Sequence, residues 1–329
     1  MLREGYQHEV VDRLGAADLI NLAVETREAP THIGAIAILD GQGLCDVDGR
    51  VRLVEFRALL DRRLEHVPQL RRIIHRPGWL AGRPLWIGDP AFRIERHVHQ
   101  VELAAPGDQE ALLHLATELL SERMDRAHPL WRIWFVTGLA SGAVAVIMGM
   151  HHVVADGLAA MRLVTSLLGA PDQAESAPSS PSTAVPAPGW CELVRDNVRT
   201  RLATISGLGT AGSPRWAISE QWQILTRSRR SSRSLLNAPV GPRRLLAVLR
   251  IGLAQAKLVA HREGCKVNDV ILDLAAGGLR ALLHSRGEPV EELWLNASVT
   301  PYRYLTRASC TSQSLLLGLI RRFVEPLHG

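Results

Sequence analysis

The sequence is poor in cysteine and contains no long apolar run. Its 329 residues include four cysteines that lie far apart and lack a metal-binding or redox spacing: Cys45, Cys191, Cys265 and Cys310. This usage excludes a disulfide framework and indicates reduced thiols. No apolar run reaches the roughly 20 residues that cross a bilayer, and the first residues lack the apolar core of a signal peptide. We therefore expect a cytoplasmic protein whose membrane contact is peripheral.

The chain carries a net positive charge. A formal net charge of +5 and a pI near 9.4 favour contact with anions such as phosphates and acidic lipid headgroups. One segment gathers four arginines, which could bind phosphate or an anionic membrane, although a solvated loop is the simpler interpretation: Arg227, Arg229, Arg230 and Arg233. Nucleic acid is not an expected partner, because no recognition helix, zinc module or aromatic platform accompanies these residues.

A proline-rich segment divides the chain. Residues 171–189 contain five prolines and no core pattern, which is typical of a flexible or extended linker. With 47% hydrophobic residues, the chain is globular in composition and long enough for two lobes. We expect one lobe in residues 1–170 and a second in residues 190–329.

Hydrophobic periodicity predicts a mixed first lobe and a helical continuation. The helices expected in the first lobe cover residues 16–24, 51–66 and 109–124, and its strands cover residues 33–39, 131–137 and 143–150. The last two strands are expected to form a hairpin across residues 138–142. The second half is expected to contain a strand at residues 245–251 and helices at residues 253–263 and 268–285.

The most informative motif follows the strand at residues 143–150. That segment is apolar at every position, which indicates a strand buried on both faces, and it runs into His-His-Val-Val-Ala-Asp-Gly at residues 151–157. Helical spacing begins after Gly157, so the two histidines are expected in a strand-to-helix turn. Turns held by a scaffold of this kind often carry functional groups.

The residue types in this turn suit acid–base chemistry. Imidazole titrates near neutral pH, so His152 could take a proton from a substrate hydroxyl and return one to the leaving group. Asp156 could pair with an arginine and fix the turn, while Gly157 leaves space beside the imidazole. His151 is also explained as an ordinary core histidine. A metal site formed by His151, His152 and Asp156 is the less favoured alternative, because no second Cys or His cluster stands nearby.

The motif and four further segments resemble the bacterial wax ester synthase/diacylglycerol acyltransferase family. The resembling segments are Asp18 with Glu25 and residues 29–34 (Ala-Pro-Thr-His-Ile-Gly), residues 124–131 ending in Pro-Leu-Trp, residues 236–244, and residues 266–270 with Asn-Asp. More distantly, the motif is similar to that of the wider CoA-dependent acyltransferases and condensation domains. The resemblance covers roughly residues 10 to 290.

The resemblance implies the two-lobe α/β fold of chloramphenicol-acetyltransferase-like CoA-dependent acyltransferases. It implies that His152 deprotonates a diacylglycerol or a long-chain alcohol, which then attacks an acyl-CoA thioester and gives triacylglycerol or a wax ester. Asp156 and Gly157 would support this base, and His151 is a further candidate catalytic residue of the motif. The substrate region would be shaped by Pro129, Leu130 and Trp131, and bordered by Asn268 and Asp269, for which a helix cap is an equally good interpretation. Acyl-CoA would be a substrate and no resident cofactor is implied.

The C-terminal part departs from the family pattern. From about Trp294 onward the sequence no longer resembles the family's valine-rich strand and Gly-Asn block, so we expect a truncated or frame-shifted chain with an incomplete second lobe. The alternative to an active enzyme is a catalytically inactive remnant that associates with lipid surfaces. A homodimer that supplies the missing wall is also left open. An active enzyme is expected in the cytoplasm, where it could lie peripherally at the inner face of the membrane or on lipid droplets.

Overall fold

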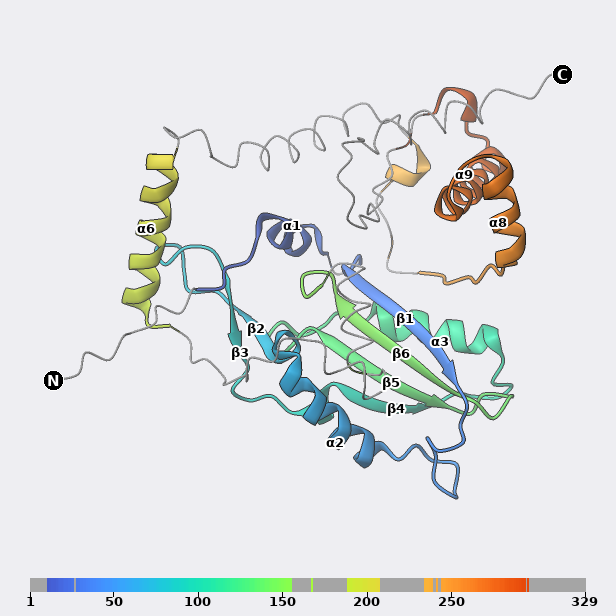
Figure 1. Ribbon diagram of the computed structural model, residues 1–329, viewed down its shortest axis with the longest axis horizontal. Helices are drawn as coiled ribbons and strands as arrows, with labels where there is room; N and C mark the ends of the chain where they lie inside the picture. The colour runs from blue at the N-terminus through green and yellow to red at the C-terminus, as the bar shows by residue number, and fades with distance from the viewer. Residues whose placement is uncertain are drawn as a thin grey trace. The chain divides into compact units, whose positions relative to one another are not determined.

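The computed structural model describes residues 11–26, 28–155, 167, 188–207, 234–238, 241, 244–293 and 295 (Figure 1). Asp156, Gly157, the arginine cluster and most of the proline-rich linker lie outside these residues. The chain divides into two compact units, residues 1–213 with 240–247 and residues 214–239 with 248–329. In the described part of the chain, no helix combines the length and apolar character needed to cross a membrane.

A four-stranded mixed sheet forms the centre of the first unit. Its order is β1-β6-β5-β4, with β1 (His32–Leu39), β6 (Val144–His151), β5 (Trp131–Thr137) and β4 (Val98–Glu102). The pairs β1–β6 and β5–β6 are antiparallel, and β4 is parallel to β5. The predicted hairpin of β5 and β6 is therefore confirmed. A separate antiparallel pair consists of β2 (Arg72–His75) and β3 (Leu85–Gly88).

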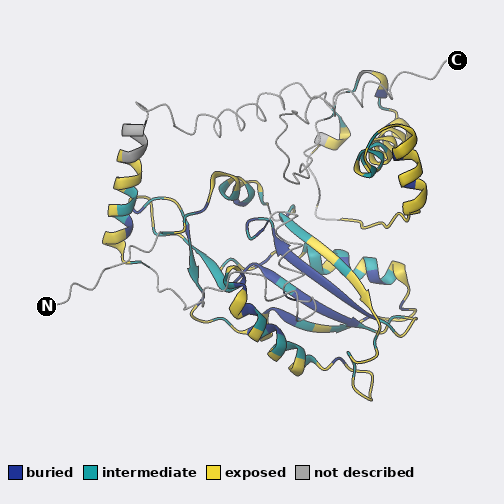
Figure 2. Ribbon diagram, in the orientation of Figure 1, coloured by how far each residue is buried: buried dark blue, intermediate teal, exposed yellow. Residues whose placement is uncertain are grey.

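Two helices cover opposite faces of the sheet, and both faces of β6 are buried (Figures 1 and 2). On one face, α2 (Leu53–Arg63) packs against Val146, Met148 and the other residues of β6 that share their side. On the other face, α3 (Gln109–Ser121) packs against Ala145 and Ile147. The continuous apolar run of β6 thus follows from its central position, as the sequence predicted.

A glycine pair lets α3 approach the sheet closely. Gly34 of β1 and Gly149 of β6 are directly opposite each other, and Leu120 near the end of α3 lies over both. A Cβ added to Gly34 would lie 2.5 Å from Leu120 Cδ1, and one added to Gly149 would lie 2.9 Å from Leu120 Cδ2. The two glycines therefore provide the space that places the C-terminal end of α3 beside the ends of β1 and β6.

Closing this space should destabilise the first unit. We expect Gly34→Ala to lower the free energy of unfolding by about 1–3 kcal/mol, because the whole Leu120 side chain must move in a packed layer. Urea unfolding followed by tryptophan fluorescence measures the change. Gly189→Ala is the matched control, since nothing lies within 4 Å of its added Cβ. An equal, small effect of both substitutions would contradict the close packing at Gly34.

Two further α-helices belong to the first unit. Helix α1 (Ala16–Val24) follows the predicted bounds, and its Leu22 is buried. Helix α6 (Trp190–Gly207) packs its buried Leu193 against Ala81 and Leu85, and its Asp196 accepts a hydrogen bond of 2.8 Å from Arg13. The first helix after the proline-rich segment therefore belongs to the first unit.

The described core of the second unit is a helix pair, α8 (Leu253–Arg262) and α9 (Val267–Ser285).

The predicted strand at residues 245–251 is wrong, because these residues have no strand structure. Leu245 is 89% exposed and Leu249 is 79% exposed, and no partner strand pairs with them in the described residues. A segment rich in leucine and β-branched residues becomes a strand only where another strand pairs with it. The local hydrophobic pattern does not show whether such a partner exists.

Candidate functional site

The two adjacent histidines leave the sheet in different environments. Strand β6 ends at His151, which is 1% exposed, whereas the half-buried His152 begins the turn that follows. The backbone N–H of His152 donates a 2.9 Å hydrogen bond to the carbonyl of Thr31, and that of His151 donates a 2.9 Å bond to Leu130. Backbone bonds to two different segments therefore hold the start of this turn.

His152 lies on the wall of a cavity of about 390 Å³. The lining comes from the N-terminal segment, α1, the β2–β3 pair and the turn itself: Asp12, Ala17, Asp18, Asn21, Gln69, Arg72, Trp86, His152, Val153, Val154 and Ala155. Arg72 and Asp12 form an ion pair of 2.6 Å there. An imidazole beside a partly apolar cavity is suitably placed to exchange a proton with a hydroxyl group that enters.

His151 points into a buried polar cluster. Its Nδ1 accepts a 3.0 Å hydrogen bond from the backbone N–H of Val153, and its Nε2 lies 3.5 Å from Glu25 Oε1. Burial lowers the pKa of His151 to about 4, although the Glu25 carboxylate opposes this shift. A neutral ring that is almost fully buried is suited to hold the turn in place rather than to meet a substrate.

Glu25 is the acidic centre of this cluster. Its carboxylate is 1% exposed, forms a very short contact with Arg126, and lies 3.4 Å from Arg123 Nη2 and 3.9 Å from His32 Nε2. Burial raises the pKa of this carboxyl, but the hydrogen bond from Arg126 and the nearby positive charges outweigh it and leave the pKa below its usual value. Sequence reasoning noted Glu25 only as part of a resembling segment, because nothing in the sequence pairs it with residues 101 to 126 positions away.

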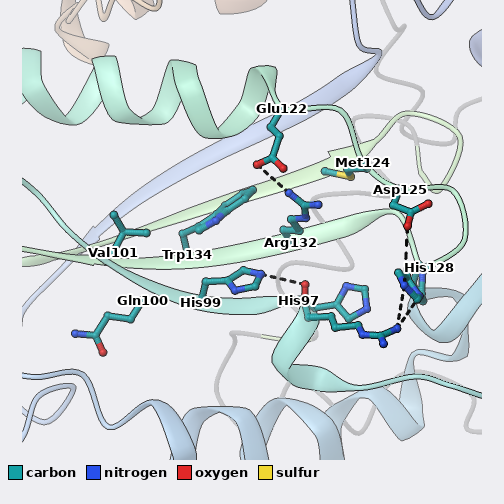
Figure 3. A pocket seen from close by; sticks show the side chains of 12 residues that line it. His97, His99, Gln100, Val101, Glu122, Met124, Asp125, His128, Arg132 and Trp134 are labelled. Carbon is teal, nitrogen blue, oxygen red and sulfur yellow. Dashed lines mark hydrogen bonds and ion pairs between the residues drawn. The ribbon is translucent and has the colours of Figure 1, made fainter. Parts of the chain in front are cut away.

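A second cavity, of about 610 Å³, lies where the end of α3 meets β4 and β5 (Figure 3). Its lining is rich in histidine and arginine: Arg96, His97, His99, Gln100, Val101, Glu122, Met124, Asp125, His128, Pro129, Arg132 and Trp134. Arg132 forms a 3.1 Å ion pair with Glu122. His99 Nε2 donates a 3.0 Å bond to the carbonyl of Arg96. Arg96 Nη1 donates a 2.9 Å bond to His128, which lies 4.0 Å from Asp125, so the charged groups of this cavity are largely paired with one another.

The predicted Pro-Leu-Trp segment is divided between cavity wall and core. Pro129 lines the second cavity, but Leu130 and Trp131 are each 1% exposed. The indole N–H of Trp131 donates a 2.7 Å hydrogen bond to the carbonyl of Leu70, and its ring stacks on that of His97 with centroids 4.6 Å apart. Leu130 and Trp131 therefore lie in the core, whereas substrate contact had been predicted for them.

The predicted Asn-Asp pair lies at the start of α9. Helix α9 begins at Val267, and Asp269 Oδ2 accepts a 2.8 Å hydrogen bond from the backbone N–H of Lys266. This bond satisfies a donor at the helix start, so Asp269 performs the capping role that had been considered for Asn268.

Metal binding was the less favoured interpretation of the histidine motif. Within the described residues, no group of three or more His, Cys, Asp and Glu side chains has an arrangement that could hold a metal ion. Asp156, the third residue considered as a ligand, lies outside them.

Two buried histidines should make the first unit sensitive to acid. Burial lowers the pKa of both His97 and His151 from 6.5 to about 4. Between these values the unfolded chain binds protons that the folded chain does not, so the free energy of unfolding should fall as the pH drops from 6.5 to 4, by roughly 2–3 kcal/mol per histidine. Urea unfolding at several pH values measures the slope.

The matched variant for this slope is His97→Asn. His97 Nδ1 donates to the carbonyl of Trp131 at 2.8 Å, and an asparagine amide can keep that donor without titrating. The slope should become shallower in the variant. A wild-type stability that stays flat between pH 6.5 and 4 would show that these rings are not held neutral.

Comparison with known proteins gives one consistent family. Residues 14–271 match the family described as the wax ester synthase/diacylglycerol acyltransferase catalytic domain. Two Mycobacterium tuberculosis H37Rv proteins named as probable diacylglycerol O-acyltransferases, tgs2 and tgs1, are 32% identical over 285 residues and 26% identical over 276 residues. The alignments cover 84% and 80% of this chain, but the chain spans only 61% and 55% of those relatives.

Two solved structures share the fold. The wax ester synthase/diacylglycerol acyltransferase from Marinobacter aquaeolei VT8 matches with a TM-score of 0.56 and 22% identity, over 84% of this chain and 61% of that one. The first condensation domain of the calcium-dependent antibiotic synthetase matches with a TM-score of 0.51 and 17% identity, over 85% of this chain and 62% of that one. These matches confirm the predicted mixed α/β fold of the CoA-dependent acyltransferases.

Proposed function

We propose a function from one premise: the chain belongs to the wax ester synthase/diacylglycerol acyltransferase family. The proposed reaction is transfer of a long-chain acyl group from acyl-CoA to the hydroxyl group of a diacylglycerol or a long-chain alcohol. The observation that carries the proposal is the position of His152 on a cavity wall at the end of a buried central strand. Acyl-CoA and the acceptor lipid are the proposed partners, with no resident cofactor.

In the proposed mechanism, His152 is the general base and then the general acid. Its neutral imidazole takes the proton of the acceptor hydroxyl, and the oxygen attacks the carbonyl carbon of the thioester. The tetrahedral intermediate collapses, the carbon–sulfur bond breaks, and the imidazolium returns the proton to the CoA thiolate. The products are the ester and free CoA.

The neighbouring residues are assigned supporting roles. Asp156 would pair with an arginine and fix the turn, and Gly157 would leave space for the substrate beside His152. Buried Leu130 and Trp131 would hold the turn from the core side, consistent with the backbone bond from His151 to Leu130. Positive charge on the chain would favour contact with an anionic membrane or a lipid-droplet surface.

The test is ester formation from purified chain and a long-chain acyl-CoA, with diacylglycerol, with hexadecanol, and without an acceptor. Free CoA and extracted ester are measured in the same samples. We expect CoA release that depends on the acceptor and equals the ester formed. Release of CoA without ester would indicate thioester hydrolysis, and no release by folded chain would favour an inactive remnant that only binds lipid surfaces.

A further inference from the structure

We propose that Glu25 is a positioning residue, which holds the His151 imidazole in a single tautomer and thereby fixes the turn that carries His152. The proposal rests on the proposed function of His152 for its effect on catalysis, but its structural part can be tested without any activity. It assigns a specific task to a buried carboxylate that the acyl-transfer mechanism does not otherwise use.

Three elements bring the participating groups together. Glu25 follows α1, Arg126 follows α3, and His151 ends β6. The side chains of Glu25 and His151 are each 1% exposed, and their closest atoms, Oε1 and Nε2, are 3.5 Å apart. The other carboxylate oxygen, Oε2, accepts from Arg126 and lies 3.4 Å from Arg123 Nη2. Each oxygen of Glu25 therefore faces a different donor group.

The hydrogen bonds determine where the His151 proton resides. The backbone N–H of Val153 donates to Nδ1 of His151 at 3.0 Å, so this nitrogen must present a lone pair. A neutral imidazole then carries its proton on Nε2, which points at a carboxylate oxygen that can only accept. Within the described residues Nε2 makes no hydrogen bond, so its contact with Glu25 Oε1 at 3.5 Å is electrostatic. Glu25 is therefore the group that favours the tautomer on which the Val153 bond depends.

The neighbouring histidine has the opposite tautomer. His32 is paired with His151 across the β1–β6 ladder, and its Nδ1 donates to the carbonyl of Leu120 at 3.0 Å. Its Nε2 consequently presents a lone pair 3.9 Å from Glu25 Oε1, so a neutral His32 gives that oxygen no proton. Glu25 Oε1 makes no hydrogen bond, and among the described residues the Nε2–H of His151 is the one imidazole proton beside it.

The tautomer matters because the turn is short and its bonds are few. Val154 N–H donates to the carbonyl of His151 at 3.0 Å, and His152 N–H donates to Thr31 at 2.9 Å. If the His151 proton moved to Nδ1, the N–H of Val153 would face another donor, and the residue after His152 would have to shift. A shift of about 1 Å can cost about 100-fold in rate when a catalytic group is misplaced.

If Glu25 served only as the partner of Arg126, its substitution would leave the His151 tautomer unchanged. The positioning role predicts a change of tautomer. In Glu25→Gln the single amide oxygen cannot serve both donors. The charged Arg126 should claim it, which turns the amide NH₂ toward His151 and favours the tautomer with the proton on Nδ1. In Glu25→Gln/Arg126→Met the short contact with Arg126 is gone and only the longer contact of the more exposed Arg123 remains, so the oxygen should turn to His151 and the original tautomer should return.

The experiment measures the tautomer directly. Chain labelled with ¹⁵N-histidine is examined at pH 7 by long-range ¹H–¹⁵N spectra, and the His151 signals are assigned from their absence in His151→Asn. We expect the Nε2–H form in the wild type, the Nδ1–H form in Glu25→Gln, and the Nε2–H form again in the double variant. Amide exchange of Val153 should be about tenfold faster or more only in Glu25→Gln, because this variant loses the bond to Nδ1.

Ester formation gives a second readout. The kcat should fall about tenfold or more in Glu25→Gln and return to within about threefold of the wild type in the double variant. An unchanged His151 tautomer and unchanged Val153 exchange in Glu25→Gln would overturn the proposal. If the wild type forms no ester, the proposed function fails, whereas the spectra still decide the role of Glu25. Thermal unfolding of each variant identifies a loss that arises from misfolding.

Discussion

Replacing His152 with alanine should lower kcat/KM for ester formation by about 1,000-fold. The substitution removes the proposed base from the wall of its cavity, while the backbone bond from residue 152 to Thr31 can still form. The fold should therefore survive. Initial rates of ester formation at several acyl-CoA and acceptor concentrations measure the loss, and thermal unfolding of the same preparations verifies the structure.

The control for this experiment is His114→Ala. His114 lies on the exposed side of α3, where its side chain is 75% exposed and 3.7 Å from Glu118. We expect rates within about twofold of the wild type, since exposed ion pairs of this kind contribute little to stability. A His152→Ala chain that keeps more than a tenth of the wild-type rate would require another base.

Trp131→Ala should cause the largest loss of stability, about 3–5 kcal/mol of the free energy of unfolding. The indole is almost fully buried, stacks on His97, and donates its N–H to the carbonyl of Leu70, so truncation leaves both a cavity and an unpaired acceptor. Urea unfolding followed by circular dichroism gives the value. A loss of this size is a large fraction of the stability of a typical domain, so the activity should also become more sensitive to temperature.

Trp79→Ala is the corresponding surface control. Trp79 is 84% exposed, so its removal should change the free energy of unfolding by about 0.5 kcal/mol or less. The same comparison distinguishes a core role for Trp131 from direct contact with substrate. A stable Trp131→Ala chain with a raised KM for acyl-CoA would favour substrate contact and contradict the core role.

Local sequence patterns predicted the elements that carry the site. Helix α1 and strand β5 have the predicted bounds, and β6 differs by one residue at each end. These segments have strong periodicity or continuous apolar character, and β5 and β6 are joined by a short turn between glycines with φ values of 81° and 72°. Local information was sufficient to place the histidine pair at a strand end.

Contacts between distant segments could not be predicted in the same way. The register that pairs His32 with His151, and the glycine pair that admits Leu120, depend on how β1 docks beside β6. The link from Glu25 to Arg126 joins residues 101 positions apart. The sequence shows Glu25 as a charged residue directly after the largely apolar helix α1, but a single sequence does not reveal the partner of that charge. The same limitation produced the incorrect strand at residues 245–251, which has no described neighbour to pair with.

The central claim is that the two adjacent histidines have different tasks, one reacting and one positioning. It is tested most directly by the initial rate of acceptor-dependent ester formation in three chains measured side by side: wild type, His151→Asn and His152→Ala. Asparagine can still accept from the N–H of Val153 but cannot reach Glu25, so a loss of about tenfold is expected for His151→Asn, against about 1,000-fold for His152→Ala. Equal losses, or a larger loss for folded His151→Asn than for His152→Ala, would contradict this division of roles.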